Sequence, residues 1–237
     1  MSDFERQFRT RAYDSARTNL ATASIFKFVY GWMSVGLIIT AVTAFLTAAT
    51  GLCGGLLAGP AMYIFIGIEL LLVFSLSAAI GKIHPLLAAL MFLLYSVVNG
   101  ITLSTIFFVY DIGSIGRVFF ISAGMFGGLA VWGTITKNDL TSIGSICGMA
   151  VWGLIIALLV NLFLRSSGLD FFISFIGILV FSGLTMYDAA KIKQMAASEY
   201  ALDAATKQRL AIIGALQLYL DFINLFLYIL RFLGRRR

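Results

Sequence analysis

The sequence predicts an all-α membrane protein with seven transmembrane helices, and three observations carry this prediction. Sixty per cent of the residues are hydrophobic and only 12% are charged, whereas about 25% of a soluble domain is charged. Apolar runs of about 20 residues, the length that crosses a bilayer, recur along the chain. The net charge of +6 comes from basic residues that flank these runs. Such residues orient helices and meet anionic lipid headgroups, so we expect no nucleic-acid partner.

Seven runs account for the predicted helices. The first is uncharged and follows a polar, basic segment. The second starts after Pro60 and holds Glu69 as its only charge, and the third starts after Pro85; the missing N–H of proline costs little in the first turn of a helix. The next two runs are uncharged, the sixth ends against Asp188, and the seventh holds only Asp221. The predicted spans are Phe28–Ala49, Ala61–Ile80, Leu86–Tyr110, Val118–Thr136, Leu140–Leu164, Phe171–Tyr187 and Leu210–Leu230.

The domain organisation follows from these spans. Residues 1–27 form a polar basic segment without the short apolar core of a signal peptide, residues 28–233 form one seven-helix domain, and residues 234–237 form a basic tail. An N-terminus in the cytoplasm places 11 Lys and Arg inside and 6 outside, as the positive-inside tendency requires. It also leaves the C-terminal arginines outside. A re-entrant seventh run would place both termini inside, and the sequence leaves that alternative open.

Two pairs of glycines have the spacing of helix-packing motifs. Gly124 and Gly128 lie on the fourth run, and Gly144 and Gly148 lie on the fifth. Small residues four apart let helix backbones approach closely in lipid. We therefore interpret both pairs as packing seams.

The seventh run carries a polar face with a carboxylate at its centre. Offsets of three, four and seven residues place its members on one side of a helix. A carboxylate in hydrocarbon is costly unless it is paired, protonated or wetted. The face is either a hydrogen-bonded seam or a lining and gating surface, and the acid favours the latter because asparagine alone would serve as a seam. Its members are Gly214, Gln217, Asp221, Asn224 and Tyr228.

Asp188 has two interpretations. It pairs with Lys191 one turn further along, a contact worth a few tenths of a kcal/mol, or it faces Asp221 across a hairpin formed by the last two runs. The connection between these runs is rich in helix formers, and Asp203 offers an N-cap for a long last helix. Such a hairpin permits the carboxyl groups of Asp188 and Asp221 to face each other, and at this point both interpretations stay open.

Glu69 has no polar neighbour one turn away on its own run. It needs a partner on another helix or a proton. Tyr95, Asn99 and Thr102 form a polar stripe on the third run and are the candidate partners.

The stretches SGLTMYDAAKI (182–192) and ALQLYLDFINLFLYILRFLG (215–234) bear a family resemblance. They are similar to the last two helices of the Bax inhibitor (transmembrane Bax-inhibitor-motif) family. The resemblance extends over nearly the whole chain: a polar N-terminus, seven close-set helices, an acid in the second helix and two aspartates near the end. The compact form is typical of a bacterial member, so we expect the bacterial inner membrane and a cytoplasmic N-terminus.

The resemblance implies a fold in which the seventh helix is central and surrounded by the other six. It also implies that Asp188 and Asp221 form a pH-responsive pair, and that Ca²⁺ leaks through some members. Together with the hairpin, the resemblance predicts that the carboxyl groups of Asp188 and Asp221 lie within hydrogen-bond reach. The doubly ionised pair would offer oxygen ligands that suit Ca²⁺, so we expect this ion to bind there only transiently. No other cofactor is implied. Bacterial relatives often carry a basic residue toward the end of the second helix that engages the pair. Here that stretch reads SLSAAIGKIH, with only Lys82, further along.

Three functions remain. The first is a pH-sensitive leak for cations, Ca²⁺ foremost, because two carboxylates in a poorly hydrated site titrate as one unit. The second is a membrane-embedded regulator of a membrane protease or of other quality-control proteins, without ion flux. The third, an intramembrane aspartyl protease, requires a Gly-x-Gly-Asp motif, and the second aspartate here follows LYL instead. We therefore predict that the protein is not an enzyme.

Overall fold

The computed structural model describes residues 3–51, 59, 61–79, 82–198 and 203–237, with side chains from residue 22 onward. Seven helices in these ranges are long and apolar enough to cross a membrane, which confirms the predicted fold class. The helices are α1 (Asp3–Ala49), α3 (Ala61–Ala79), α4 (Pro85–Leu103), α5 (Ile106–Val109), α6 (Ile112–Ile135), α7 (Thr141–Leu164), α8 (Ser167–Ser198) and α9 (Ala204–Leu233).

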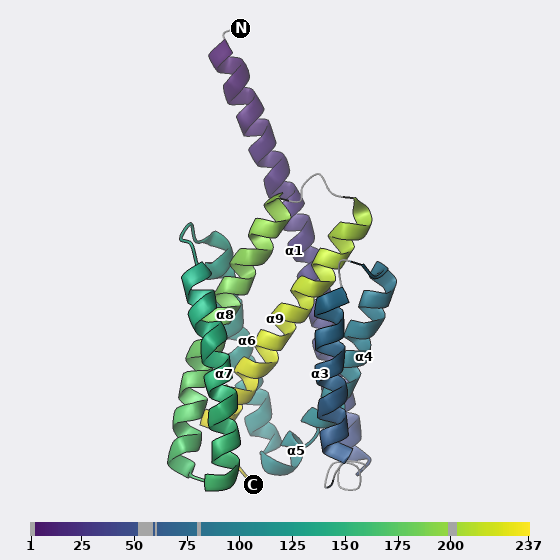
Figure 1. Cartoon of the computed structure of the whole chain (residues 1–237), viewed down its shortest axis with the longest axis vertical. Helices are drawn as coiled ribbons and strands as arrows, with labels where there is room; N and C mark the ends of the chain where they lie inside the picture. The colour runs from purple at the N-terminus through teal and green to yellow at the C-terminus, as the bar shows by residue number, and fades with distance from the viewer. Residues whose placement is uncertain (1–2, 52–58, 60, 80–81, 199–202) are drawn as a thin grey trace.

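Helix α9 is the most enclosed of the seven spans. It runs obliquely through the bundle (Figure 1) and packs extensively against α1, α4, α6 and α8. In its most apolar stretch 72% of the residues are buried, against 11% in α3 and α7. Helix α3 packs mainly on α4, and α7 packs mainly on α8. Four helices therefore make the close contacts with α9, and its enclosure by all six stays a prediction.

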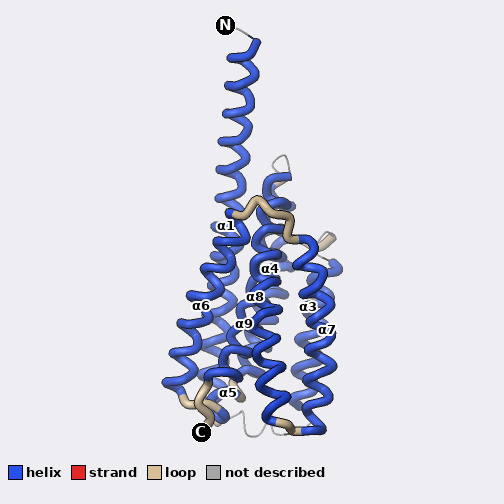
Figure 2. The backbone as a smooth tube through the Cα atoms, turned by 90° about the vertical axis from the view of Figure 1, so that its left-hand side faces the viewer, coloured by secondary structure: helices blue, strands red, loops and turns tan. Residues whose placement is uncertain are grey.

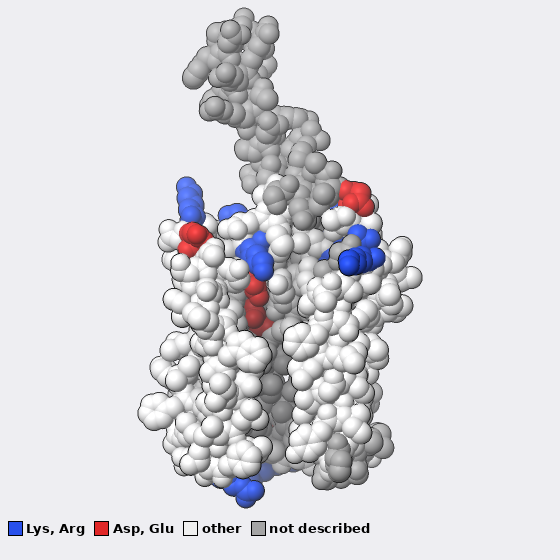
Figure 3. All heavy atoms as spheres, viewed as in Figure 1, with Lys and Arg blue, Asp and Glu red and all other residues white. Residues whose placement is uncertain are grey.

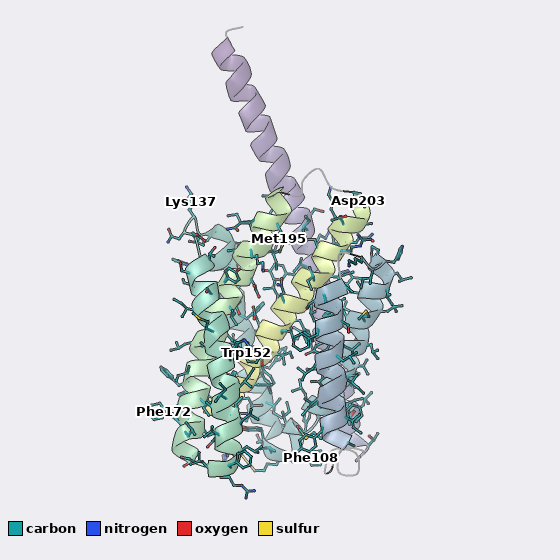
Figure 4. All side chains as sticks on the ribbon, viewed as in Figure 1. Phe108, Lys137, Trp152, Phe172, Met195 and Asp203 are labelled. Atoms are coloured by element: carbon teal, nitrogen blue, oxygen red, sulfur yellow. The ribbon has the colours of Figure 1, made fainter. Side chains whose placement is uncertain are left out.

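The bundle presents an apolar outer surface, as a protein in lipid must. Trp152 on α7 and Phe172 on α8 are 68% and 61% exposed, and both belong to the outward-facing side chains drawn in Figure 4. Helix α1 continues without a break through residues 3–27, and Figure 2 shows its N-terminal part projecting beyond the other helices, whereas Ile25 is already buried in the bundle. The polar N-terminal segment is thus helical from residue 3.

The third predicted span is divided at its end. The hydroxyl of Ser104 donates to the carbonyl of Ile101, and the hydroxyl of Thr105 donates to the carbonyl of Thr102. Such local bonds compete with the regular helical ladder. Helix α4 therefore ends at Leu103, and the short helix α5 completes the crossing.

Helix α9 crosses the whole bundle, so the two chain ends lie at opposite ends of it (Figure 1). The alternative of a re-entrant seventh run is therefore wrong. Helix α8 continues well past the predicted end at Tyr187, and Asp203 precedes α9, where its carboxylate accepts a hydrogen bond from the Thr206 hydroxyl. Both helices thus extend beyond the predicted apolar runs, as the helix-forming residues of their connection indicate.

The two glycine pairs do not form the predicted seams. Only Gly144 lies against a neighbouring helix, where the ring of Tyr187 on α8 leaves no room for a Cβ. Gly124, Gly128 and Gly148 have open space where a side chain would be. The prediction is therefore wrong for three of the four, because GxxxG spacing places two glycines on one helix face without specifying that a helix covers that face.

Candidate functional site

The contact between α8 and α9 is the most extensive between any two described helices, and an aromatic stack fixes its register. The rings of Phe181 and Tyr228 lie parallel within 25°, with centroids 5.6 Å apart. Gly177, one turn before Phe181, leaves the space that the Tyr228 ring fills. The two helices are therefore locked at one antiparallel alignment.

Two turns along both helices from this stack, Asp188 meets Asp221. Their carboxyl groups lie within hydrogen-bond reach of each other. Asp221 is only 4% exposed, and its Oδ2 atom is enclosed without a further hydrogen-bond partner. An ionised carboxylate has only acceptors, so a hydrogen bond between two carboxyl groups needs one proton on the pair. The arrangement can therefore respond to proton concentration.

Among the residues that the structure describes, one basic side chain acts on the pair, and it acts at a distance. Lys191 influences Asp188 electrostatically, but its ammonium group lies over the Tyr187 ring, 5.6 Å from the centroid. Among the described residues neither aspartate forms an ion pair. Lys82 is exposed beyond the end of α3 and, within those same residues, forms no ion pair that would latch the site.

Figure 3 shows how the charges are distributed on one face of the molecule. Acidic atoms lie in a furrow between the two sides of the bundle, in the region where α8 and α9 diverge in the matching view of Figure 1. Basic atoms lie above them toward the end of the bundle that carries the N-terminus. The acidic groups are thus withdrawn from the surface but not sealed from it.

The rest of the polar face of α9 does not form one connected network. The Oε1 atom of Gln217 is enclosed and has no hydrogen-bond partner. The Asn224 amide donates to the carbonyl of Leu220 on its own helix. Tyr228 takes part through its ring, which stacks on Phe181 and lies under the guanidinium of Arg231. The structure therefore joins only Asp221 of this face directly to Asp188.

A second polar cluster lies on the other side of α9. The hydroxyls of Thr40 and Tyr219 are 2.6 Å apart, and Thr40 donates to the carbonyl of Ser96. The Tyr219 hydroxyl also lies 3.4 Å from the side-chain oxygen of Asn99, whose amide donates to the hydroxyl of Tyr95. This cluster ties α9 to α1 and α4. Sequence reasoning identified Tyr95 and Asn99 but missed Thr40 and Tyr219, because each looks like an isolated residue in an apolar run.

Glu69 on α3 has one of the three predicted partners. It is hydrogen-bonded to Thr102 of α4, while its Oε1 atom is enclosed without a partner. Its charge acts on the hydroxyls of Tyr95 and Tyr219 without a direct bond. Glu69 therefore borders the second cluster rather than the aspartate pair.

The two aspartates alone do not make a complete Ca²⁺ site. This ion takes six to eight oxygen ligands. The described residues contain no group of three or more acidic, histidine or cysteine side chains that could hold a metal.

A comparison with protein families identifies the chain. The model of the family described as "Inhibitor of apoptosis-promoting Bax1" matches residues 22–237, which is nearly the whole chain. The chain belongs to this Bax inhibitor family. It is an integral membrane protein of that family, with seven apolar helices.

Relatives in several bacteria share most of its length. The inner membrane protein YbhL of Escherichia coli K12 is 43% identical over 212 residues, which cover 88% of this chain and 90% of YbhL. An uncharacterized protein of Borreliella burgdorferi is 47% identical over 211 residues, with the same coverage of each chain. An uncharacterized membrane protein of Streptococcus pyogenes serotype M1 is 39% identical and covers 71% of this chain and 72% of its own.

Proposed function

We propose that this protein is a pH-dependent cation leak in which Ca²⁺ is the passing ion and the α8–α9 contact is the gate. One observation supports the proposal above the others. Two carboxyl groups within hydrogen-bond reach meet at the seam of the most enclosed helix, with Asp221 4% exposed. Ionisable groups inside membrane proteins are costly and commonly mark ion or proton pathways.

The gate works through the shared proton. With one proton on the pair, a hydrogen bond joins Asp188 to Asp221 and holds α8 against α9. When that proton leaves, two negative charges face each other in a poorly hydrated site, where repulsion is much stronger than in water. The helices then separate at this point. The ionised carboxylates also present oxygen ligands of the kind that Ca²⁺ prefers.

The bacterial inner membrane and a cytoplasmic N-terminus are parts of the proposal. The relative YbhL is named an inner membrane protein. Because the chain ends lie at opposite ends of the bundle, the end with the N-terminus carries 11 of the 17 Lys and Arg. The positive-inside tendency then places that end in the cytoplasm. The proposal assigns no catalytic step to the protein.

Flux through liposomes tests the proposal. The purified protein is reconstituted around a Ca²⁺-sensitive dye, and dye response is recorded from about pH 5 to about pH 8. Flux should rise as the pair ionises, and Asp188→Asn and Asp221→Asn should each flatten this dependence because asparagine cannot ionise. Asp139→Asn, which alters an exposed acid in the α6–α7 connection, should leave the profile unchanged.

A negative result in this experiment would favour a second function. No flux from any of the proteins, or one shared pH profile, would contradict the leak and favour a regulator that binds a membrane protease or another membrane protein. The observation that favours such a regulator is the N-terminal part of α1, which projects beyond the bundle (Figure 2).

A further inference from the structure

A cavity of about 560 Å³ lies at the end of the bundle opposite the N-terminus, far from the aspartate pair along α9. Residues of α5, α7, α8 and α9 and of the C-terminal tail line it. One wall is charged, with Arg231, Arg236 and Asp170. Most of the remaining lining is apolar, and this apolar wall includes Leu158 and Leu162 of α7, beside the polar Asn161. The cavity thus combines charged and apolar groups, as an amphipathic ligand site does.

The charges on the polar wall do not cancel. Asp170 accepts a hydrogen bond of 2.9 Å from Arg236, and the Nε atom of Arg231 lies 3.7 Å from its other oxygen. One carboxylate therefore serves two guanidinium groups. The Nη1 atom of Arg231 is enclosed and finds no acceptor in the structure. A buried donor without an acceptor is unfavourable. An anion would supply that acceptor and would also balance the one positive charge that Asp170 leaves on the two guanidinium groups.

The tail holds Arg236 in place. The Arg235 amide donates to the Ser114 hydroxyl, and the Asp111 amide donates to the Arg235 carbonyl. On the other side of Arg236, the Arg237 amide donates to the carbonyl of Val109. A side chain whose backbone is already fixed loses less freedom when it binds a ligand. The guanidinium of Arg236 is therefore preorganised at the rim of the cavity.

We propose that this cavity binds the phosphate of an anionic phospholipid, with the lipid chains along α7. Guanidinium groups match phosphate oxygens in a bidentate geometry, and basic pockets between transmembrane helices recognise anionic headgroups. The apolar wall selects a lipid over a free anion. Leu162 is 65% exposed and Val109 is 46% exposed, so the apolar wall continues onto the lipid-facing surface. The proposal is independent of ion flux.

Native mass spectrometry of the full-length protein tests the site. The detergent-purified protein is titrated with phosphatidylglycerol and, separately, with phosphatidylcholine of the same chain length. Phosphatidylglycerol should bind about tenfold more tightly, because both lipids carry the phosphate but phosphatidylcholine adds a trimethylammonium group that the two guanidinium groups repel. Arg236→Gln should abolish this preference. Arg117→Gln, on α6 at the same end of the bundle but outside the lining, should preserve it.

A second variant separates the lipid from a free anion. Leu162→Glu on the exposed apolar wall should weaken phosphatidylglycerol binding while leaving Arg236 in place. Equal affinity for the two lipids, or an unchanged preference in Arg236→Gln, would overturn the proposal. Displacement of phosphatidylglycerol by an equal concentration of inorganic phosphate would also overturn it, because the site would then be a free-anion site.

Discussion

The ring of Phe181 stacks on the ring of Tyr228, two turns from the place where Asp188 meets Asp221 on the same two helices. Consecutive residues on a helix point about 100° apart. A slip of one residue between α8 and α9 would therefore turn both carboxyl groups away from each other. The aromatic stack thus sets the register on which the pairing of the two acids depends.

Gly177→Ala should destabilise the protein by about 1–3 kcal/mol, the usual cost of forcing extra volume into a packed seam. A Cβ at this position would overlap the ring of Tyr228. The measurement is the free energy of unfolding in detergent, followed by the loss of helical circular dichroism. Gly148→Ala is the matched control, because Gly148 faces open space. It should be neutral or stabilising by up to about 1 kcal/mol. Equal costs for the two variants would show that the stack does not lock the register.

Thermal stability should fall as pH rises through the range in which the pair loses its shared proton. The hydrogen bond between Asp188 and Asp221 exists only while the pair holds a proton. Its contribution, about 1 kcal/mol for a polar contact between membrane helices, is present on the acid side and lost on the basic side. Asp221→Asn keeps a donor at all pH values, so its melting temperature should depend less on pH. A parallel decline in both proteins would refute this.

Asp139 should show the opposite sign and serves as an internal check. It lies outside the spans, and hydrogen bonds from the hydroxyl and the amide of Thr141 lower the pKa of its carboxyl. A lowered pKa means that the contribution is present near neutral pH and is lost as pH falls through the lowered pKa. Asp139→Asn should therefore remove this acid-side loss, so the stability difference between the parent and the variant should be present near neutral pH and should shrink as pH falls. Melting curves below about pH 5, where carboxylates begin to protonate, measure the effect.

How much could be predicted from the sequence depended on the type of signal. The spans follow from apolar length, which the bilayer fixes. The meeting of Asp188 and Asp221 is expected from the family resemblance, together with a hairpin of consecutive helices that permits it without requiring it. The partners of α3, α6 and α7 in the bundle do not follow, because lipid and protein are equally apolar surroundings for a leucine-rich helix face. The open faces of Gly124 and Gly148 are a consequence of this ambiguity.

The second polar cluster illustrates the same limit at the level of single residues. Tyr219 stands two residues from Asp221, on a different face of α9, and its partner Thr40 is on the first span. The hydroxyl of a single threonine in a membrane helix donates to a backbone carbonyl of its own helix as readily as it bonds to a neighbouring helix. Only the packing of α9 between α1 and α4 selects the second arrangement.

Tyr219→Phe tests whether this cluster anchors α9 on the side away from the gate. The substitution keeps the ring, which packs edge-on against Phe92 and Tyr95, and removes only the hydroxyl that contacts Thr40 and Asn99. The Asn99 oxygen then loses a donor in a buried site, at a cost of about 1–3 kcal/mol. Unfolding free energies in detergent measure this loss.

Tyr228→Phe is the matched control for that experiment. Its ring is also buried on α9, but within the described part of the chain its hydroxyl makes no hydrogen bond. Removal of the hydroxyl should therefore cost less than about 0.5 kcal/mol, the range of substitutions that touch no special feature.

If α9 moves during gating, it must pivot on the side that stays attached to α1 and α4. Tyr219→Phe should then also raise Ca²⁺ flux at acid pH, where the aspartate pair is closed. A stability loss without any change in flux would show that the cluster only holds the fold, and equal losses in both tyrosine variants would contradict the anchoring role itself.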